Sequence, residues 1–320
     1  MFYNFCTLFD RNYLYKGLAL YNSLKKHCRN FKLFILCMDN ITYNLLMKMN
    51  LNNIELISLK EFEDPDLSRI KNTRTPGEYC WTCTASLILF LLRKYQDLEM
   101  MTYLDADLFF YNNPQPIFNE FGYNSIFIIE HNFSKEYQKL LMPLHGKYNV
   151  QFIIFKNDKY SLEALKWWRQ KTIDWCYNKL QDGKFGDQLY LNDWPDRFKG
   201  VYVLQNKKLC LAPWNATKYH IFLKNNEIYV EDSKLIIYHF HSFEINNLNK
   251  FSLADRRYKI DKSFKDLVYS SYIREIRSVI RRVMEIDPLF KYGFTKRSIN
   301  KKKIKGLIEG LIYSFFRIKA

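Results

Sequence analysis

The chain has 320 residues, enough for one large domain or for one domain with an appendage. Apolar residues make up 48% of the chain and charged residues 26%, which excludes a wholly disordered protein, and only 10 glycines exclude a collagen-like one. The net charge of +16 indicates an anionic partner such as nucleic acid, an acidic membrane or a phosphorylated substrate. The abundance of Lys, Asn, Ile, Tyr and Phe is also typical of AT-rich coding bias, which is a non-functional source for part of this charge.

The N-terminal segment MFYNFCTLFDRNYL has neither a basic leader nor a long apolar run, so it does not resemble a signal peptide. The apolar stretches 87–92 and 307–316 are too short to cross a bilayer. Seven scattered cysteines, with Cys80 and Cys83 as the one close pair, are typical of reduced thiols. We therefore expect a soluble cytoplasmic protein.

Apolar runs alternate with helical spacing along the first part of the chain. They predict strands over 1–9, 31–38 and 54–59, and helices over 11–27 and 41–49. This alternation predicts βαβ units and an α/β fold, with a mixed, mostly parallel sheet covered by helices on both faces.

The polar segment 61–77, which contains Pro65 and Pro76, is predicted to be a loop. The pattern beyond it predicts helices over 81–95, 162–180 and 187–194, and strands over 100–104, 126–130, 150–155, 201–204, 227–230 and 235–239.

The composition changes near residue 262, which predicts a main domain over 1–262 and a basic helical region over 263–320. Residues 270–320 contain 13 Lys and Arg and 4 Asp and Glu, and this difference of +9 is more than half of the total charge. The segments 272–284 and 301–316 have the pattern of basic amphipathic helices. Two interpretations stay open for this region: docking on an anionic membrane surface, and a helical cap or oligomer contact.

A pair of carboxylates follows the strand predicted over 100–104. Asp105 and Asp107 are one residue apart at its carboxyl end, the edge of an open α/β sheet where ligands bind. Two carboxylates so close repel each other, share a proton or bind a cation, and oxygen ligands suit Mn²⁺ or Mg²⁺. The alternative is a solvated turn after a strand.

Five segments in order resemble the GT-A-fold nucleotide-sugar glycosyltransferases, as in the bacterial relatives of glycosyltransferase family 8. They are TLFDRNYLYKGLALYNSL, YLDADLFFYNNPQPIF, KYNVQFIIF, FGDQLYLNDWP and LIIYHFHSF, which together cover roughly residues 1–245. The resemblance implies the GT-A fold and a nucleotide-sugar donor, with UDP favoured.

The resemblance also implies a role for each matching residue. The metal ligands would be Asp105, Asp107 and a histidine, His239 or His241. Nucleotide contacts would come from Thr7, Asp10, Tyr13, Asp39, Arg74 and Ala106. The donor sugar would meet Asn149 and Gln151, and the catalytic residues would be Asp187 and Gln188.

Structural alternatives stay open for several of these residues. Asp10 and Asp187 each precede a predicted helix and are candidate N-caps. A histidine at a strand end is often bonded to a backbone carbonyl. Trp81 and Trp214 are expected in the core.

The chain also departs from the family 8 pattern. The stretch Ala85-Ser86-Leu87 lacks the basic residue usual before D-x-D, and Arg74 is a candidate replacement. The G-x-x-K-P-W segment that follows the late histidine is absent, and Gln151 stands where relatives often have Gly. The residue that neutralises the leaving diphosphate is thus not identified from the sequence.

These observations predict a metal-dependent glycosyltransferase of hexosyltransferase type, retaining by analogy. Its acceptor would be a cell-surface glycan or a lipid-linked precursor in cell-envelope polysaccharide or lipopolysaccharide synthesis, at the inner face of the cytoplasmic membrane. A sugar nucleotidyltransferase is the second interpretation, although TLFDRNY lacks its Gly-rich phosphate loop. A nucleic-acid-binding protein is the third, although the charge is gathered in the C-terminal region and not along a groove.

Overall fold

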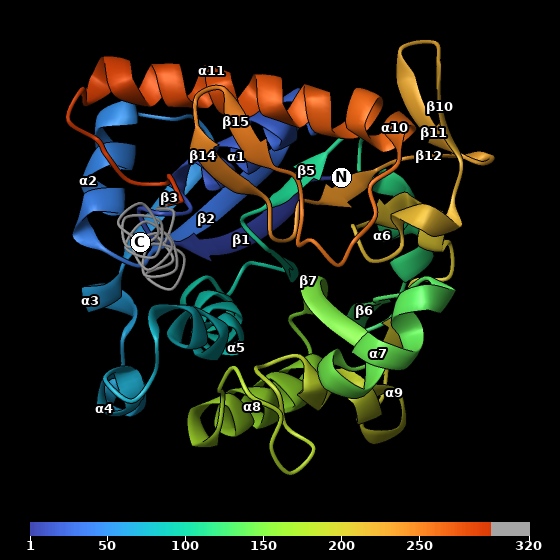
Figure 1. Ribbon diagram of the computed structural model, residues 1–320. Coiled ribbons are helices and arrows are strands. Elements are labelled where there is room, and N and C mark those ends of the chain that lie inside the picture. The colour runs from blue at the N-terminus through green and yellow to red at the C-terminus, as the bar shows by residue number, and fades with distance from the viewer. Residues whose placement is uncertain (296–320) are drawn as a thin grey trace, which may run out of the picture.

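The computed structural model describes residues 1–295, and its centre is a seven-stranded sheet (Figure 1). The strands lie in the order β3-β2-β1-β4-β7-β6-β8. Their bounds are β1 Tyr3–Phe9, β2 Phe31–Cys37, β3 Ile54–Ser58, β4 Met100–Leu104, β6 Ile126–Glu130, β7 Tyr148–Lys156 and β8 Val201–Val203.

Most neighbouring strands of this sheet run parallel. The pairs β1·β2, β2·β3, β1·β4 and β6·β8 are parallel, whereas β7 runs antiparallel to both β4 and β6. Strands such as β2 are apolar almost throughout because both faces of the sheet are buried. The predicted mixed, mostly parallel sheet is confirmed.

Helices cover both faces of the sheet, and each face has its own apolar cluster. One face packs on α1 (Leu14–His27), α2 (Asn40–Met49), α6 (Gln115–Phe121), α10 (Lys262–Phe264) and α11 (Ser270–Ile286). The other packs on α3 (Leu59–Phe62), α4 (Pro65–Lys71), α5 (Pro76–Lys94), α8 (Lys159–Asp174) and α9 (Trp194–Arg197). Figure 1 shows α1 and α11 on one side of the strands and α5 and α8 on the other.

Three small sheets and several short helices complete the described part of the chain. One sheet joins β5 (Leu108–Phe110), β13 (Ile237–His239) and β9 (Cys210–Leu211). The other two join β10 (Ile221–Lys224), β11 (Glu227–Val230) and β12 (Ser233–Lys234), and β14 (Glu244–Asn247) and β15 (Lys250–Ser252). The remaining helices are α7 (Lys135–His145), η1 (Leu189–Asp193), η2 (Lys207–Leu209), η3 (Ala216–Lys218) and η4 (Lys265–Tyr269).

The prediction of a loop over 61–77 is wrong, because this segment contains helix α4 and the first residues of helix α5. The side chains of Asp64 and Thr75 cap α4 and α5, and each is followed by a proline. Thr75 and Glu78 form a reciprocal capping box. Proline at the first helical position loses no helix hydrogen bond, so these prolines mark helix starts and not a loop.

Other predicted bounds also differ from the structure. α8 ends at Asp174, six residues before the predicted end, because Trp175 is extended and the chain turns away. The strand predicted over 227–230 is β11, whereas β5, α6, α7, the strand β10 that pairs with β11, and the β14·β15 hairpin were not predicted. Most of these elements are shorter than the window in which periodicity can be recognised, and α7 has Pro143 inside it.

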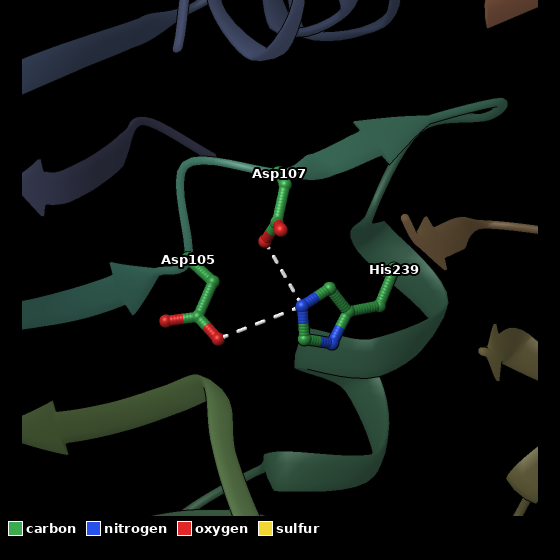
Figure 2. A group of neighbouring side chains, drawn as sticks. All are labelled: Asp105, Asp107 and His239. Carbon is green, nitrogen blue, oxygen red and sulfur yellow. Dashed lines mark hydrogen bonds and ion pairs between the residues drawn. The ribbon is translucent and has the colours of Figure 1, made fainter. Parts of the chain in front are cut away.

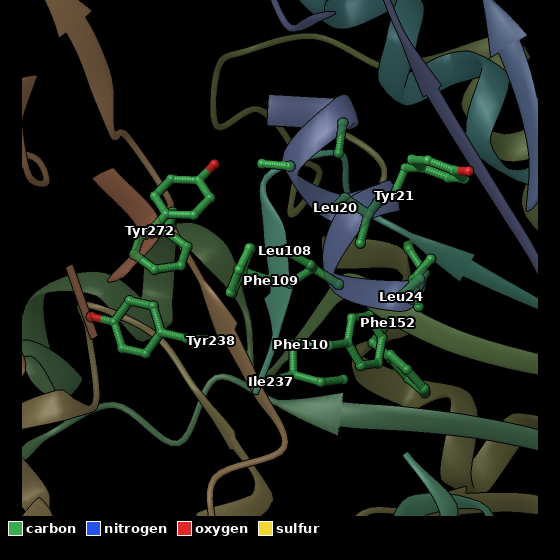
Figure 3. Packing of buried hydrophobic residues seen from close by; sticks show 14 of the residues in the cluster. Leu20, Tyr21, Leu24, Leu108, Phe109, Phe110, Phe152, Ile237, Tyr238 and Tyr272 are labelled. Atoms are coloured by element: carbon green, nitrogen blue, oxygen red, sulfur yellow. The ribbon is translucent and has the colours of Figure 1, made fainter. Parts of the chain in front are cut away.

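The predicted helix 272–284 is α11, and its apolar face is buried in the same cluster as α1. Figure 3 shows Tyr272 of α11 near Phe109 of β5, and their ring centroids lie 5.4 Å apart. The ring of Tyr272 stacks on Phe240 with 3.6 Å between centroids. This is the packing of a helical cap on the sheet. The helix predicted over 301–316 lies outside the described residues, and the boundary at 262 stays a prediction.

Within residues 1–295, every helix is too short or too polar to cross a bilayer.

Replacing Ile280 with Ala tests whether α11 belongs to the cooperative core. Ile280 is fully buried in the α1 cluster, so Ile280→Ala should lower the free energy of unfolding by about 2–5 kcal/mol. Met284, on the exposed side of the same helix, is the control, and Met284→Ala should change it by less than about 0.5 kcal/mol. Urea denaturation measures both values. An equal effect of the two substitutions would contradict the packing.

Candidate active site

The two carboxylates stand where the central strand β4 ends. The backbone N–H of Asp105 donates to the carbonyl of Gln151 in β7 (2.9 Å), which keeps the chain in the sheet up to this residue. The N–H of Leu108 then donates to the carbonyl of Asp105 (3.1 Å), so the chain turns tightly into β5. This turn presents the side chains of Asp105 and Asp107 close together.

A histidine from far along the chain completes the group. β13 pairs with β5 so that His239 lies opposite Leu108, and the N–H of Phe240 donates to the carbonyl of Asp107 (2.9 Å). The Nε2 atom of His239 is 2.9 Å from Oδ1 of Asp107 and 3.8 Å from Oδ2 of Asp105 (Figure 2).

These three side chains suit a divalent metal. Each offers one ligand atom, and the three atoms lie within 4.8 Å of one another. Two carboxylate oxygens with one imidazole nitrogen are donors that proteins use for such ions, and carboxylates in particular suit Mn²⁺ and Mg²⁺. The group is thus a potential divalent-metal site.

The electrostatics of the group reflect burial and mutual contact. Burial, with the nearby charge of Asp107, raises the pKa of Asp105 to about 6. Burial also acts to raise the pKa of Asp107, but His239 and Lys16 outweigh it and hold that pKa below its usual value. Burial acts to lower the pKa of His239, but the Asp107 carboxylate raises it overall.

His241, the second candidate histidine, is not in this group. Its ring lies 5.6 Å from that of His239, and it lines the space in front of the group. Burial lowers its pKa to about 4, so it is neutral at physiological pH.

Two adjoining cavities open beside the group. One, of about 260 Å³, reaches the start of α1 and α5, and the other, of about 330 Å³, reaches β7 and the loop before η1. Both are lined by Trp81, Tyr103, Asp105 and His241, so Asp105 stands at their junction.

Most of the predicted site residues line one cavity or the other. The smaller cavity is lined by Asp10, Tyr13, Ala106, Asp107 and His239. The larger one is lined by Asn149, Gln151, Asp187 and Gln188.

The larger cavity has unusual polar chemistry. Nδ2 of Asn149 and Oε1 of Gln151 are buried with no hydrogen-bond partner among the described residues, which is costly without a ligand or water. Asp187 is also buried, and burial together with the charge of Asp105 raises its pKa well above the usual value. Its backbone carbonyl accepts from Nε1 of Trp168 (2.9 Å), which fixes the loop at this point.

Three predicted residues do not line either cavity. Thr7 is fully buried in β1. Asp39 caps α2 by accepting from the N–H of Thr42 (2.8 Å). The guanidinium of Arg74 donates to the carbonyl of Ile173 (3.1 Å) and stacks on Tyr177, so it does not take the place of the missing basic residue in the cavities.

Several lining or supporting residues were not predicted. Trp214 is buried in a small apolar cluster, as expected, but it also lines the larger cavity, as do Trp81, Thr84 and His131. Lys16 of α1 reaches Asp107, with 3.7 Å between Nζ and Oδ2. The sequence carries no signal for this contact, because an isolated lysine in a helix usually faces solvent.

Known proteins of similar sequence cover nearly the whole chain, although no protein-family model matches it. YfnD of Bacillus subtilis (strain 168) is 32% identical over 91% of this chain and 94% of its own length. YfnF of the same organism is 33% identical over 93% of this chain and 99% of its own length. Both are described as uncharacterized proteins.

Solved structures show a similar fold. The galactosyltransferase LgtC, in complex with donor and acceptor sugar analogues, matches with a TM-score of 0.53 at 13% identity, over 86% of this chain and 95% of LgtC. An active-site mutant of LgtC matches with a TM-score of 0.50 at 12% identity, over 83% and 95%. At this identity the likeness shows the fold alone, which is that of GT-A-like glycosyltransferases.

Acid should destabilise the protein through His131. This ring is buried beside the larger cavity, with Nδ1 3.1 Å from the carbonyl oxygen of Gly146, and burial lowers its pKa from 6.5 to about 3. Between these values the unfolded chain binds the proton and the folded chain does not. The free energy of unfolding should therefore fall as the pH drops from 6.5 towards 3, by up to about 1.4 kcal/mol per pH unit from this residue.

Unfolding by urea at pH 6.5, 5.5 and 4.5 measures this slope. His131→Gln, which has no titrating ring, should give a shallower slope than the native chain by up to one proton. Equal slopes would exclude His131 as the acid-sensitive group.

Proposed function

We propose that the chain, which belongs to the same family as the Bacillus subtilis proteins YfnD and YfnF, is a metal-dependent glycosyltransferase. It would move a sugar from a nucleotide-diphosphate sugar to a cell-surface glycan or a lipid-linked acceptor. The observation that carries the proposal is the Asp105, Asp107 and His239 group at the junction of two cavities, within a glycosyltransferase fold.

The charge of the cavities supports a metal. Among the described residues that line them there is no Lys or Arg, whereas Asp10, Asp105, Asp107 and Asp187 all contribute carboxyl groups. A donor diphosphate would find no Lys or Arg among these lining residues and would be repelled by the ionised carboxylates unless a cation lay between them. Mn²⁺ or Mg²⁺ held by Asp105, Asp107 and His239 would act as a Lewis acid that stabilises charge on the leaving diphosphate.

The smaller cavity is the proposed nucleotide site. Tyr13 at the start of α1 offers an aromatic face for the base, and Asp10 offers a carboxylate to accept from a base N–H. A uridine base is favoured by the resemblance to the family 8 enzymes. The backbone at Ala106, between the two carboxylates, would lie beside the ribose.

The larger cavity is the proposed donor-sugar site. The unpartnered Nδ2 of Asn149 and Oε1 of Gln151 are suited to bind sugar hydroxyls. Asp187 and Gln188 would face the reacting carbon, where a carboxyl or amide dipole stabilises the positive charge that develops on the sugar ring. Transfer of a hexose with retention follows from the family 8 resemblance.

Hydrolysis of the donor tests the reaction without knowledge of the acceptor. UDP-, GDP- and CMP-sugars are incubated with the protein and Mn²⁺, and release of the free sugar is measured. We expect turnover of at least one donor, loss of turnover with EDTA, and a decrease of at least about 100-fold for Asp107→Asn, because several kcal/mol of charge stabilisation are lost.

Asp196→Asn is the matched control, since Asp196 is an exposed aspartate in α9 that lines neither cavity. It should keep native turnover. Turnover that survives both EDTA and Asp107→Asn would rule out the metal role.

We also propose that the enzyme docks on the anionic inner face of the cytoplasmic membrane through α11. Arg274, Arg277, Arg281 and Arg282 are exposed on this helix, while its apolar face is buried against the domain. Docking would therefore be electrostatic, at about 1 kcal/mol per basic residue near the surface, and not by insertion of the apolar face.

Vesicle flotation of the full chain tests the docking. Replacing the four arginines with Gln should weaken binding to vesicles that contain phosphatidylserine by at least about tenfold, because surface attraction is lost. A control replaces four exposed lysines, Lys159, Lys166, Lys171 and Lys179, with Gln and should change binding less. If the arginine and lysine replacements weakened vesicle binding equally, the binding would depend on the net charge of the protein and not on α11.

A further inference from the structure

Lys16 occupies a position that is unfavourable for a lysine. It lies in the first turn of α1, where the helix dipole disfavours positive charge, and it is only 7% exposed. Burial of an ammonium group is costly unless the charge is compensated. The compensation comes from Asp107, with 3.7 Å between Nζ and Oδ2, and from the ring of Tyr13, 4.2 Å from Nζ.

The ammonium group reaches Asp107 from outside the cavities. Lys16 does not line either cavity, whereas Asp107 and His239 line the smaller one. Oδ2 of Asp107 faces Lys16, and Oδ1 faces Nε2 of His239. The two oxygens of one carboxylate are therefore divided between the ammonium group of Lys16 and the proposed metal site.

This division changes the charge balance of the site. Asp105 and Asp107 contribute two negative charges, and the ammonium of Lys16, buried with Asp107, returns one positive charge beside them. A divalent ion held by Asp107 would share that carboxylate with Lys16. Because the group is buried, water and salt screen the repulsion between the two cations poorly.

A donor diphosphate reverses this effect. A divalent ion that is bound to a diphosphate carries no net positive charge, so Lys16 no longer repels the incoming complex. The ammonium also attracts the diphosphate, in cavities whose described lining residues include no Lys or Arg. Lys16 thus acts in opposite directions on the free ion and on its diphosphate complex.

We propose that Lys16 is a positioning residue that acts through Asp107 and makes metal binding depend on the donor diphosphate. The free protein binds a divalent ion weakly, and the ion is held tightly only together with the nucleoside diphosphate. This inference rests on the proposed function, because it assumes that Asp105, Asp107 and His239 bind the metal and that the donor is a nucleoside diphosphate sugar.

Mn²⁺ binding, measured by electron paramagnetic resonance, tests the inference without turnover. The full-length protein is titrated with Mn²⁺ alone and with saturating UDP, GDP or CDP. In the native chain we expect at least one diphosphate to tighten Mn²⁺ binding at least tenfold. Lys16→Met should bind Mn²⁺ alone at least tenfold more tightly than the native chain and lose most of the tightening.

Linkage gives an internal check on this result. The factor by which a diphosphate tightens Mn²⁺ binding must equal the factor by which Mn²⁺ tightens diphosphate binding. Isothermal titration of the diphosphate should therefore show the same reduction in Lys16→Met. Lys25→Met, which removes an exposed lysine from the last turn of the same helix, is the matched control and should keep the native values.

The outcomes separate this inference from the proposed function. If the native chain binds no Mn²⁺ with or without a diphosphate, the proposed metal site is wrong. If it binds Mn²⁺ and Lys16→Met has equal or weaker affinity, or if no diphosphate tightens the native binding, only the role of Lys16 is wrong. Lys16→Gln is a second neutral variant should Met at this position prevent folding, and Lys16→Arg, which keeps the charge, should restore the native coupling.

Discussion

Two carboxylates one residue apart, at the buried end of the central strand, impose the main constraint on this structure. Asp105 and Asp107 cannot both remain ionised there without positive charge close by. Within residues 1–295 that charge comes from His239 and Lys16, which approach opposite oxygens of Asp107. The turn after β4, the end of β13 and the start of α1 are all held in place around this pair.

The packing behind the site keeps these segments together. β5 leaves Asp107 directly and pairs with β13, so the register of one short ladder fixes His239 beside the carboxylates. The outer side of that ladder packs on α11, where Tyr272 stacks on Phe240 and meets Phe109 edge to face. The basic helix α11 therefore supports the site through its apolar face and leaves its own arginines at the surface.

The positions of the basic residues in the structure are more informative about function than the net charge of the chain. The described residues that line the two cavities include no Lys or Arg, although the chain carries 49 of them. The basic residues of α11 are exposed, and Lys16, which contacts Asp107, does not line either cavity. An anionic donor would thus depend on a cation at the Asp105 and Asp107 pair, and the arginines of α11 lie outside the two cavities.

Local sequence determined the strands of the central sheet, the helices over 14–27 and 270–286, and the place of Asp105 and Asp107 at a strand end, because apolar periodicity and strand-end polarity are local properties. Local sequence did not decide whether His239 or His241 binds the metal. It suggested Arg74 as the basic residue near the diphosphate, and it did not indicate that Lys16 contacts Asp107. The tertiary structure decided these points. His239 meets Asp107 across 132 residues because β13 pairs with β5 in one register, and Lys16 meets it because α1 packs against β5. Such contacts depend on how distant segments pack, which no short stretch of sequence encodes.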